Sequence, residues 1–120
     1  MQAEEHEAAA MRIERSLRKC SADDHEIVIE AAMLAGSHWL NARLHRLGTT
    51  PPAQDLMHTY LLVVNELRRL SVAAPQAAAA LSEIEDLRPA YVRGAHPGGA
   101  QAAQRALSLL DVIRGSARPV

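Results

Sequence analysis

The sequence predicts an all-α protein, folded as an antiparallel up-and-down bundle of four to five helices. Apolar residues make up 48% of the 120 residues but aromatic residues only 2%, so Leu, Ile, Val, Met and Ala must build the core. Alanine and leucine favour helices, whereas strands favour β-branched and aromatic side chains. Apolar residues also recur at steps of three and four along most of the chain, which is the period of a helix with one buried face.

The first two helices are predicted from this period and from capping motifs. The first covers about residues 3–20 and has a narrow apolar stripe. The motif "SADD" then predicts a helix start, with Ser21 as the N-cap and Asp24 three residues later, as in a capping box. The second helix should run to about residue 47, where Gly48 can adopt the left-handed conformation that ends a helix. Since it is long and mostly apolar, we expect it to be the central helix, buried on more than one side.

Three further helices complete the predicted domain. Thr50 is the expected N-cap of the third, because the prolines that follow it need no amide partner in a first turn. This helix ends near residue 71, and its predicted core stripe is Leu56, Tyr60, Val63, Val64, Leu67 and Leu70. A fourth helix should begin at Gln76 and stop at Pro89. A fifth covers about residues 99–114 and is followed by a frayed tail. Residues 1–120 thus form one domain, with its core at about 22–114.

Charge and cysteine content restrict the classes of function. The net charge is −1, so the chain has no overall basic field for nucleic acid. Twelve of the 13 basic residues are arginine, a bias that a GC-rich genome explains. Cys20 is the only cysteine, which favours a reducing, cytoplasmic location. No stretch has the length and apolarity of a membrane span or signal peptide, and nothing indicates a cofactor.

A group of polar residues marks the second and third predicted helices. His38, Asn41 and His45 are spaced three and four apart and share one side of the second helix, and His58 follows on the next. We interpret all four as binding or packing residues that hydrogen-bond beside the core. Metal sites in bundles usually combine Glu with a Glu-x-x-His pairing, which this chain lacks, so no metal ligand is predicted. A metal site built from the three histidines stays open as an alternative.

The second group of candidate residues lies between the fourth and fifth helices, in "RPAYVRGAHPGG". Arg88, Tyr91, Arg93 and His96 occur where one helix ends and another begins, and the helix start adds backbone amides that favour anions. Two arginines, a tyrosine and a histidine could hold a phosphate or act on one. The competing interpretation is an exposed loop in which Arg88 pairs with Glu85 or with the helix end.

Two segments resemble HEPN-domain proteins. They are "AAMLAGSHWLNARLHRLGTTPPAQDLMHT" and "ALSEIEDLRPAYVRGAHPGGAQAAQRALSLLDVIR", and the likeness covers about residues 22–114. It implies an up-and-down helical bundle, commonly a dimer, that often pairs with a small nucleotidyltransferase; some members are RNA-cleaving toxins of toxin–antitoxin pairs. Arg88 and Tyr91 match the family's "LR…Y" exit. The ribonuclease motif, an arginine followed by a histidine after four to six residues, is not met, because seven residues separate Arg88 from His96 and two separate Arg93 from it.

The sequence therefore favours a cytoplasmic, homodimeric, HEPN-like bundle that serves as a non-catalytic binding or partner module. Nucleotides, nucleic acid and a nucleotidyltransferase are its further candidate partners. Two alternatives remain open. One is a ribonuclease or nucleotide-handling enzyme that uses the loop from Arg88 to His96. The other is a metal-binding bundle that uses His38, His45 and His58.

Overall fold

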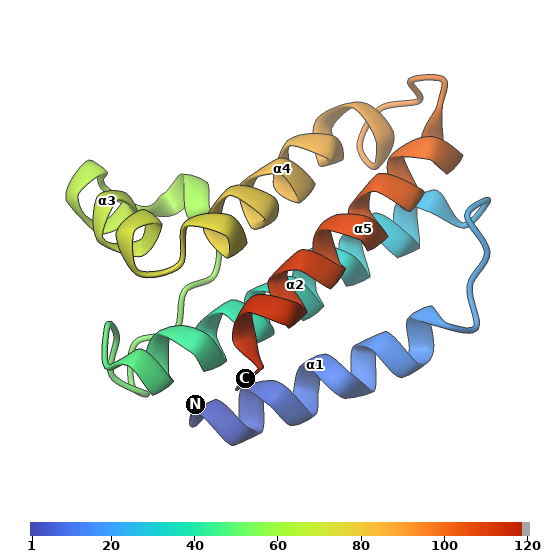
Figure 1. The fold of residues 1–120 in the computed structure, drawn as a ribbon. Coiled ribbons are helices and arrows are strands. Elements are labelled where there is room, and N and C mark those ends of the chain that lie inside the picture. Colours follow the sequence, from blue (N-terminus) through green and yellow to red (C-terminus); the bar gives the residue numbers. More distant parts are fainter. Residues whose placement is uncertain (119–120) are drawn as a thin grey trace.

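Five α-helices and one short 3-10 helix form the fold, and no strand occurs in residues 1–118, the part of the chain that the computed structural model describes. The elements are α1 (Ala3–Leu17), α2 (His25–Leu47), η1 (Thr59–Leu61), α3 (Val64–Ala73), α4 (Pro75–Tyr91) and α5 (Gly99–Ala117). The helices α1, α2, α4 and α5 lie alongside one another, and successive members of this set run in opposite directions (Figure 1). The predicted all-α bundle is confirmed.

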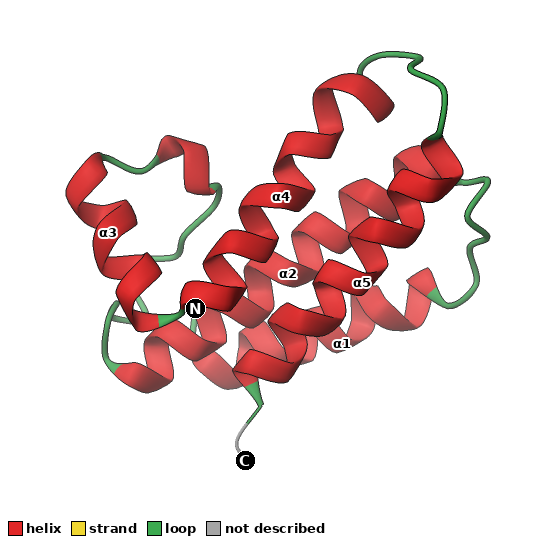
Figure 2. Ribbon diagram, turned by 45° about the horizontal axis from the view of Figure 1, so that its top comes forward, coloured by secondary structure: helices red, strands yellow, loops and turns green. Residues whose placement is uncertain are grey.

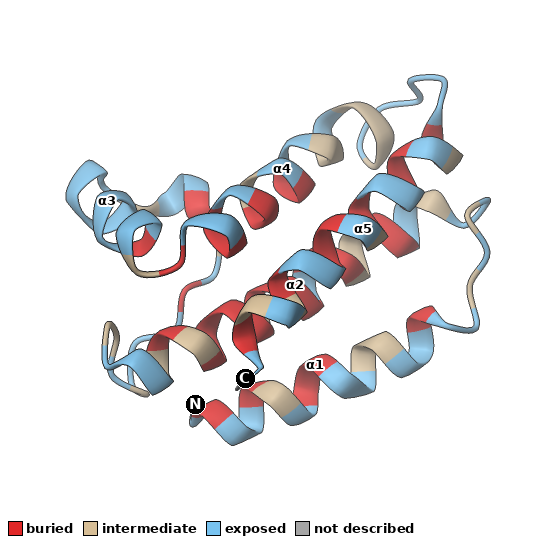
Figure 3. Ribbon diagram, viewed as in Figure 1, coloured by how far each residue is buried: buried red, intermediate tan, exposed pale blue. Residues whose placement is uncertain are grey.

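Helix α2 is the centre of the bundle, as predicted. It packs against α1, α4 and α5, and its Trp39, Leu40 and Ile29 side chains have no solvent exposure. Gly36 lets α5 approach closely, since a Cβ atom there would lie 2.9 Å from Cδ1 of Ile113. Both α2 and α5 contain many buried residues, coloured red in Figure 3, and the two helices pack against each other. Burial of aliphatic side chains between α2 and its neighbours therefore supplies most of the hydrophobic stabilisation.

The predicted boundary between the first two helices is shifted. Helix α1 ends at Leu17 instead of residue 20, and α2 begins at His25 with Asp24 as its N-cap. The Ser21 amide donates to Oδ2 of Asp24 at 2.9 Å, so the predicted contact between these residues forms, but Asp24 and not Ser21 is the N-cap of α2. Gly48 has a φ of 73° and ends α2 in the left-handed conformation, as predicted.

The predicted third helix is wrong over its first half. Residues 51–58 contain no helix; η1 follows, and α3 begins only at Val64. Side chains from the bundle bind the backbone groups that a helix would have paired internally: Asn41 binds Leu56, and Glu85 binds Thr59. Thr50 is consequently no N-cap. Helix α3 stands apart from the four-helix group, and its surface is mostly exposed (Figures 2 and 3).

The ends of the last two helices also differ from the prediction. Pro89 does not stop α4, which continues to Tyr91; the helix loses the amide donor of Pro89 but resumes with the bond from the Val92 amide to the Arg88 carbonyl at 2.9 Å. Helix α5 continues to Ala117, through part of the predicted frayed tail; residues 119–120 of that tail lie outside the described residues. Within residues 1–118, no helix combines the length and the apolarity that are needed to cross a membrane.

Candidate functional site

The structure separates the four candidate residues between α4 and α5. Arg88 points to α2, where its Nε donates to Oε1 of Glu30 at 2.6 Å. Tyr91 meets the His96 ring edge-on, with 5.5 Å between ring centroids. Arg93 is exposed, and Nδ1 of His96 contacts the Pro97 carbonyl at 3.0 Å. Only Tyr91 and His96 are therefore brought together, and Arg88 pairs with Glu30 instead of Glu85.

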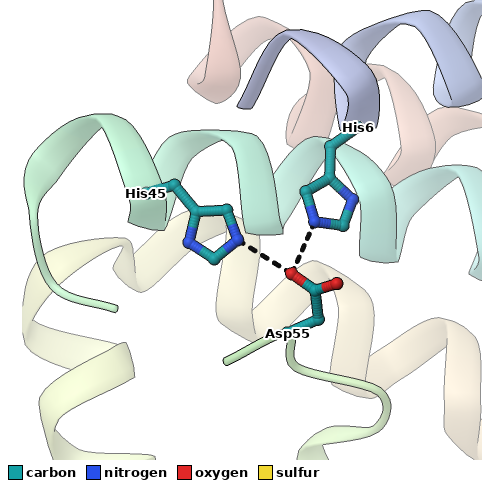
Figure 4. A group of neighbouring side chains, drawn as sticks. All are labelled: His6, His45 and Asp55. Atoms are coloured by element: carbon teal, nitrogen blue, oxygen red, sulfur yellow. Dashed lines mark hydrogen bonds and ion pairs between the residues drawn. The ribbon is translucent and has the colours of Figure 1, made fainter. Parts of the chain in front are cut away.

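The polar side of α2, in contrast, contacts side chains from two other segments of the chain. His38 and His45 meet His6, which α1 contributes, and Asp55, which comes from the segment between α2 and η1 (Figure 4 shows His6, His45 and Asp55). Nδ1 of His38 lies 2.9 Å from Nδ1 of His6. Nε2 of His6 and Nε2 of His45 lie 2.7 and 2.9 Å from the same oxygen, Oδ1 of Asp55. We call these four residues the His–Asp cluster.

One set of proton positions satisfies the contacts of the His–Asp cluster, apart from the contact between Nδ1 of His45 and the Thr50 carbonyl. An ionised carboxylate only accepts hydrogen bonds, so both Nε2 atoms that face Asp55 carry protons. In this arrangement Nδ1 of each of the two rings accepts a bond. His6 receives it from the Nδ1–H group of His38, and His45 receives it from the Thr50 hydroxyl at 2.9 Å. The cluster is therefore a continuous hydrogen-bonded chain that joins α1, α2 and the segment before η1.

The electrostatics of the cluster keep Asp55 ionised and His38 neutral. Burial opposes ionisation of Asp55, but hydrogen bonds from His6 and His45 outweigh it and bring the pKa to about 2. Burial lowers the pKa of His38 from its ordinary value of 6.5, and the neighbouring His6 lowers it further. The folded state thus favours an ionised Asp55 carboxylate beside a neutral His38 imidazole near neutral pH.

Asn41, a predicted binding residue, acts inside the protein. Its side chain is buried, and Nδ2 donates to the carbonyls of Ser37 at 2.9 Å and Leu56 at 2.8 Å. Oδ1 accepts from the Leu56 amide at 2.7 Å. Asn41 therefore fixes both backbone groups of Leu56, the residue that follows Asp55, and so positions that carboxylate.

His58 belongs to a different set of contacts. Its Nδ1 lies 3.1 Å from Oε2 of Glu85, and its ring stacks on Tyr60 with centroids 4.8 Å apart. Glu85 is buried in α4 and also accepts from the amide and hydroxyl of Thr59. The histidine that joins His38 and His45 is thus His6 and not His58. His6 shares the α1 stripe with Ala10 and Leu17, and this spacing is the signal in the sequence that could have identified it.

A third feature is an exposed apolar surface beside the Arg88–Glu30 pair. On α2, Ile27 and Leu34 are 62% and 49% exposed, and on η1 Tyr60 and Leu61 are 62% and 65% exposed. The pKa of Arg88 is raised because its hydrogen bond to Glu30 outweighs the effect of burial. Tyr60 raises this pKa further, so Tyr60 lies beside the ion pair. We call the surface formed by Ile27, Glu30, Leu34, Tyr60, Leu61 and Arg88 the α2–η1 face.

Comparisons with known protein families, with curated proteins and with solved structures give no match to this chain.

Proposed function

We propose that the protein is a non-catalytic, HEPN-like partner module that forms a homodimer through its α2–η1 face. The carrying observation is that apolar side chains whose pattern predicts burial are exposed in the single chain. Within the α2–η1 face, Ile27 and Leu34 belong to the mostly apolar second helix and Tyr60 to the predicted core stripe of the third, and all three are exposed. A contiguous exposed apolar surface on a small protein is typical of an interaction site.

The α2–η1 face has the composition of an interface. Its part on α2 is an apolar depression between Ile27 and Leu34, bordered by Glu30 and Ala31. Tyr60 and Arg88 lie on the η1 side, and tyrosine and arginine are enriched where proteins contact each other. Apolar area and a polar pair within one face would provide both the driving force and the register of an interaction.

A second copy of the chain fits this face because the face carries both charges. In a two-fold dimer each partner presents the same residues, so the face must be complementary to itself. Glu30 and Arg88 of one subunit can exchange partners with the same pair of the other. The two long α2 helices would then cross at their exposed stripes, and small Ala31 side chains allow a close approach.

The oligomeric state tests this proposal directly. We expect light scattering after size-exclusion chromatography to give twice the chain mass of 13.0 kDa. Leu34→Glu should weaken the dimer about 100-fold, because an unpaired charge would be buried in the interface. A mass of one chain for the wild type at tens of micromolar would contradict the proposal.

Val112→Glu on α5 is the matched control, since Val112 is an exposed helical residue of similar exposure outside the α2–η1 face. Its dimer should equal that of the wild type, with unchanged circular dichroism. If the wild type is monomeric until a nucleotidyltransferase is added, and Leu34→Glu abolishes that complex, the face binds a different partner and the homodimer is excluded.

A further inference from the structure

The donor atoms of the His–Asp cluster have the arrangement of a metal site. Nε2 of His6, Nε2 of His45 and Oδ1 of Asp55 all lie within 4.8 Å of one another. They come from α1, from α2 and from the segment before η1, and their side chains point to a common centre (Figure 4). Three ligands of this kind, two imidazoles and one carboxylate, are the set that many zinc enzymes present to a metal with one open position.

We infer that His6, His45 and Asp55 bind a divalent first-row transition ion such as zinc. Imidazole and carboxylate ligands select this class of ion over calcium and magnesium, which take oxygen ligands. Zinc lies about 2.0–2.2 Å from nitrogen and oxygen ligands. The ion would take the place of the two Nε2 protons of His6 and His45, each of which moves to Nδ1 of the same ring. Asp55 can adjust because it lies outside any helix.

The surroundings of both imidazoles suit a bound ion. When Nε2 binds a metal, the ring proton moves to Nδ1 and needs an acceptor. For His45 this acceptor is the Thr50 carbonyl, 3.1 Å from Nδ1, whereas the Thr50 hydroxyl at 2.9 Å serves the metal-free tautomer. For His6 it is Nδ1 of His38, which accepts once its own proton occupies Nε2. The contacts therefore fit both states.

Burial and access also fit a metal centre. The side chains of His6 and His45 are only 3% and 2% exposed, so their positions are fixed before an ion arrives. The Asp55 side chain is 35% exposed and gives one route from solvent. A cavity of about 220 Å³ borders Asp55 and Thr50, so water can also reach the carboxylate from this side.

Zinc titration of the chain without a polyhistidine tag tests the inference, with calorimetry as the readout. We expect one zinc ion per chain. His6→Ala, His45→Ala and Asp55→Asn should each weaken the zinc Kd about 100-fold or more. His38→Ala should weaken it about 10- to 100-fold, as loss of an outer hydrogen-bond partner does. His58→Ala is the matched control and should leave the Kd unchanged.

Cobalt binding to the wild type gives a readout that requires no variant to fold. We expect the intense visible absorption of four-coordinate Co²⁺, with displacement by zinc. The absence of one-to-one zinc binding up to millimolar concentration, a zinc Kd that His6→Ala and Asp55→Asn do not change in folded protein, or a loss in His58→Ala equal to theirs would each overturn the inference. In the first case the His–Asp cluster is a hydrogen-bonded network only.

Discussion

At the scale of single residues, Asn41 shows how a buried side chain positions a segment without secondary structure. It pairs both backbone groups of Leu56, and these groups have no helix or strand to satisfy them.

Asn41→Ala would leave a buried amide and a buried carbonyl of Leu56 without partners. We therefore expect it to lower the free energy of unfolding by about 2–4 kcal/mol, measured by urea denaturation. Asn65→Ala in α3, where the asparagine is exposed, should change it by less than about 0.5 kcal/mol. Equal effects of the two variants would contradict this role.

The residues of the His–Asp cluster were only partly predictable. The spacing of His38, Asn41 and His45 correctly predicts that they share one side of α2. Asp55 could not be assigned, since its position depends on how residues 48–58 fold back on α2, and a helix was expected there. Local patterns describe which residues share a face, but they do not specify which segment of a different element will meet that face.

At the scale of elements, the contact between His6 and His38 makes the docking of α1 on α2 sensitive to acid. The pKa of His38 is lowered in the folded protein, so the unfolded chain binds the proton more readily. The contribution of His38 to the stability of the folded state is therefore fully present above pH 6.5, its ordinary pKa. This contribution is lost as the pH falls from 6.5 through the folded-state pKa. Asp55 acts in a separate window, since its contribution is complete above about pH 4 and is lost toward pH 2.

We therefore expect the melting temperature of the wild type to fall between pH 7 and pH 5 and that of His38→Gln to fall less, as measured by circular dichroism at 222 nm. Glutamine keeps a hydrogen-bonding group but does not titrate. His96→Gln removes an exposed histidine instead and should retain the wild-type slope. Parallel slopes for wild type and His38→Gln would show that His38 does not control this response.

The elements themselves were predicted well where a helix packs along its whole length. The period of apolar residues identifies α2, α4 and α5 because each buries a continuous stripe in the bundle. It fails between Thr50 and Val63, where apolar residues have the same spacing but pack irregularly or are exposed. A helical period indicates that residues can form one apolar surface. It does not indicate whether the chain itself or a partner covers that surface, because this depends on the tertiary structure.

At the scale of the whole molecule, the two proposed sites involve different residues of the bundle. The His–Asp cluster joins α1 to the C-terminal half of α2, while the α2–η1 face uses the N-terminal half of α2. Helix α2 contributes to both because, as the central helix, it has one polar side turned to α1 and one apolar stripe left exposed. Metal binding and dimer formation can therefore be measured separately, each with variants that leave the other site intact.

At this scale, variants of Arg88 distinguish the proposed partner module from the alternative ribonuclease. Since Arg88 pairs with Glu30 inside the α2–η1 face, Arg88→Ala should weaken the dimer about tenfold or more, measured by analytical ultracentrifugation. Arg105→Ala breaks a comparable ion pair, with Glu83, elsewhere on the surface and should leave the dimer unchanged.

Single-stranded RNA incubated with the wild type should stay intact on a denaturing gel, because Arg88 and His96 are not brought together. RNA cleavage by the wild type that both Arg88→Ala and His96→Ala abolish, with Arg105→Ala still active, would instead assign the loop from Arg88 to His96 to catalysis.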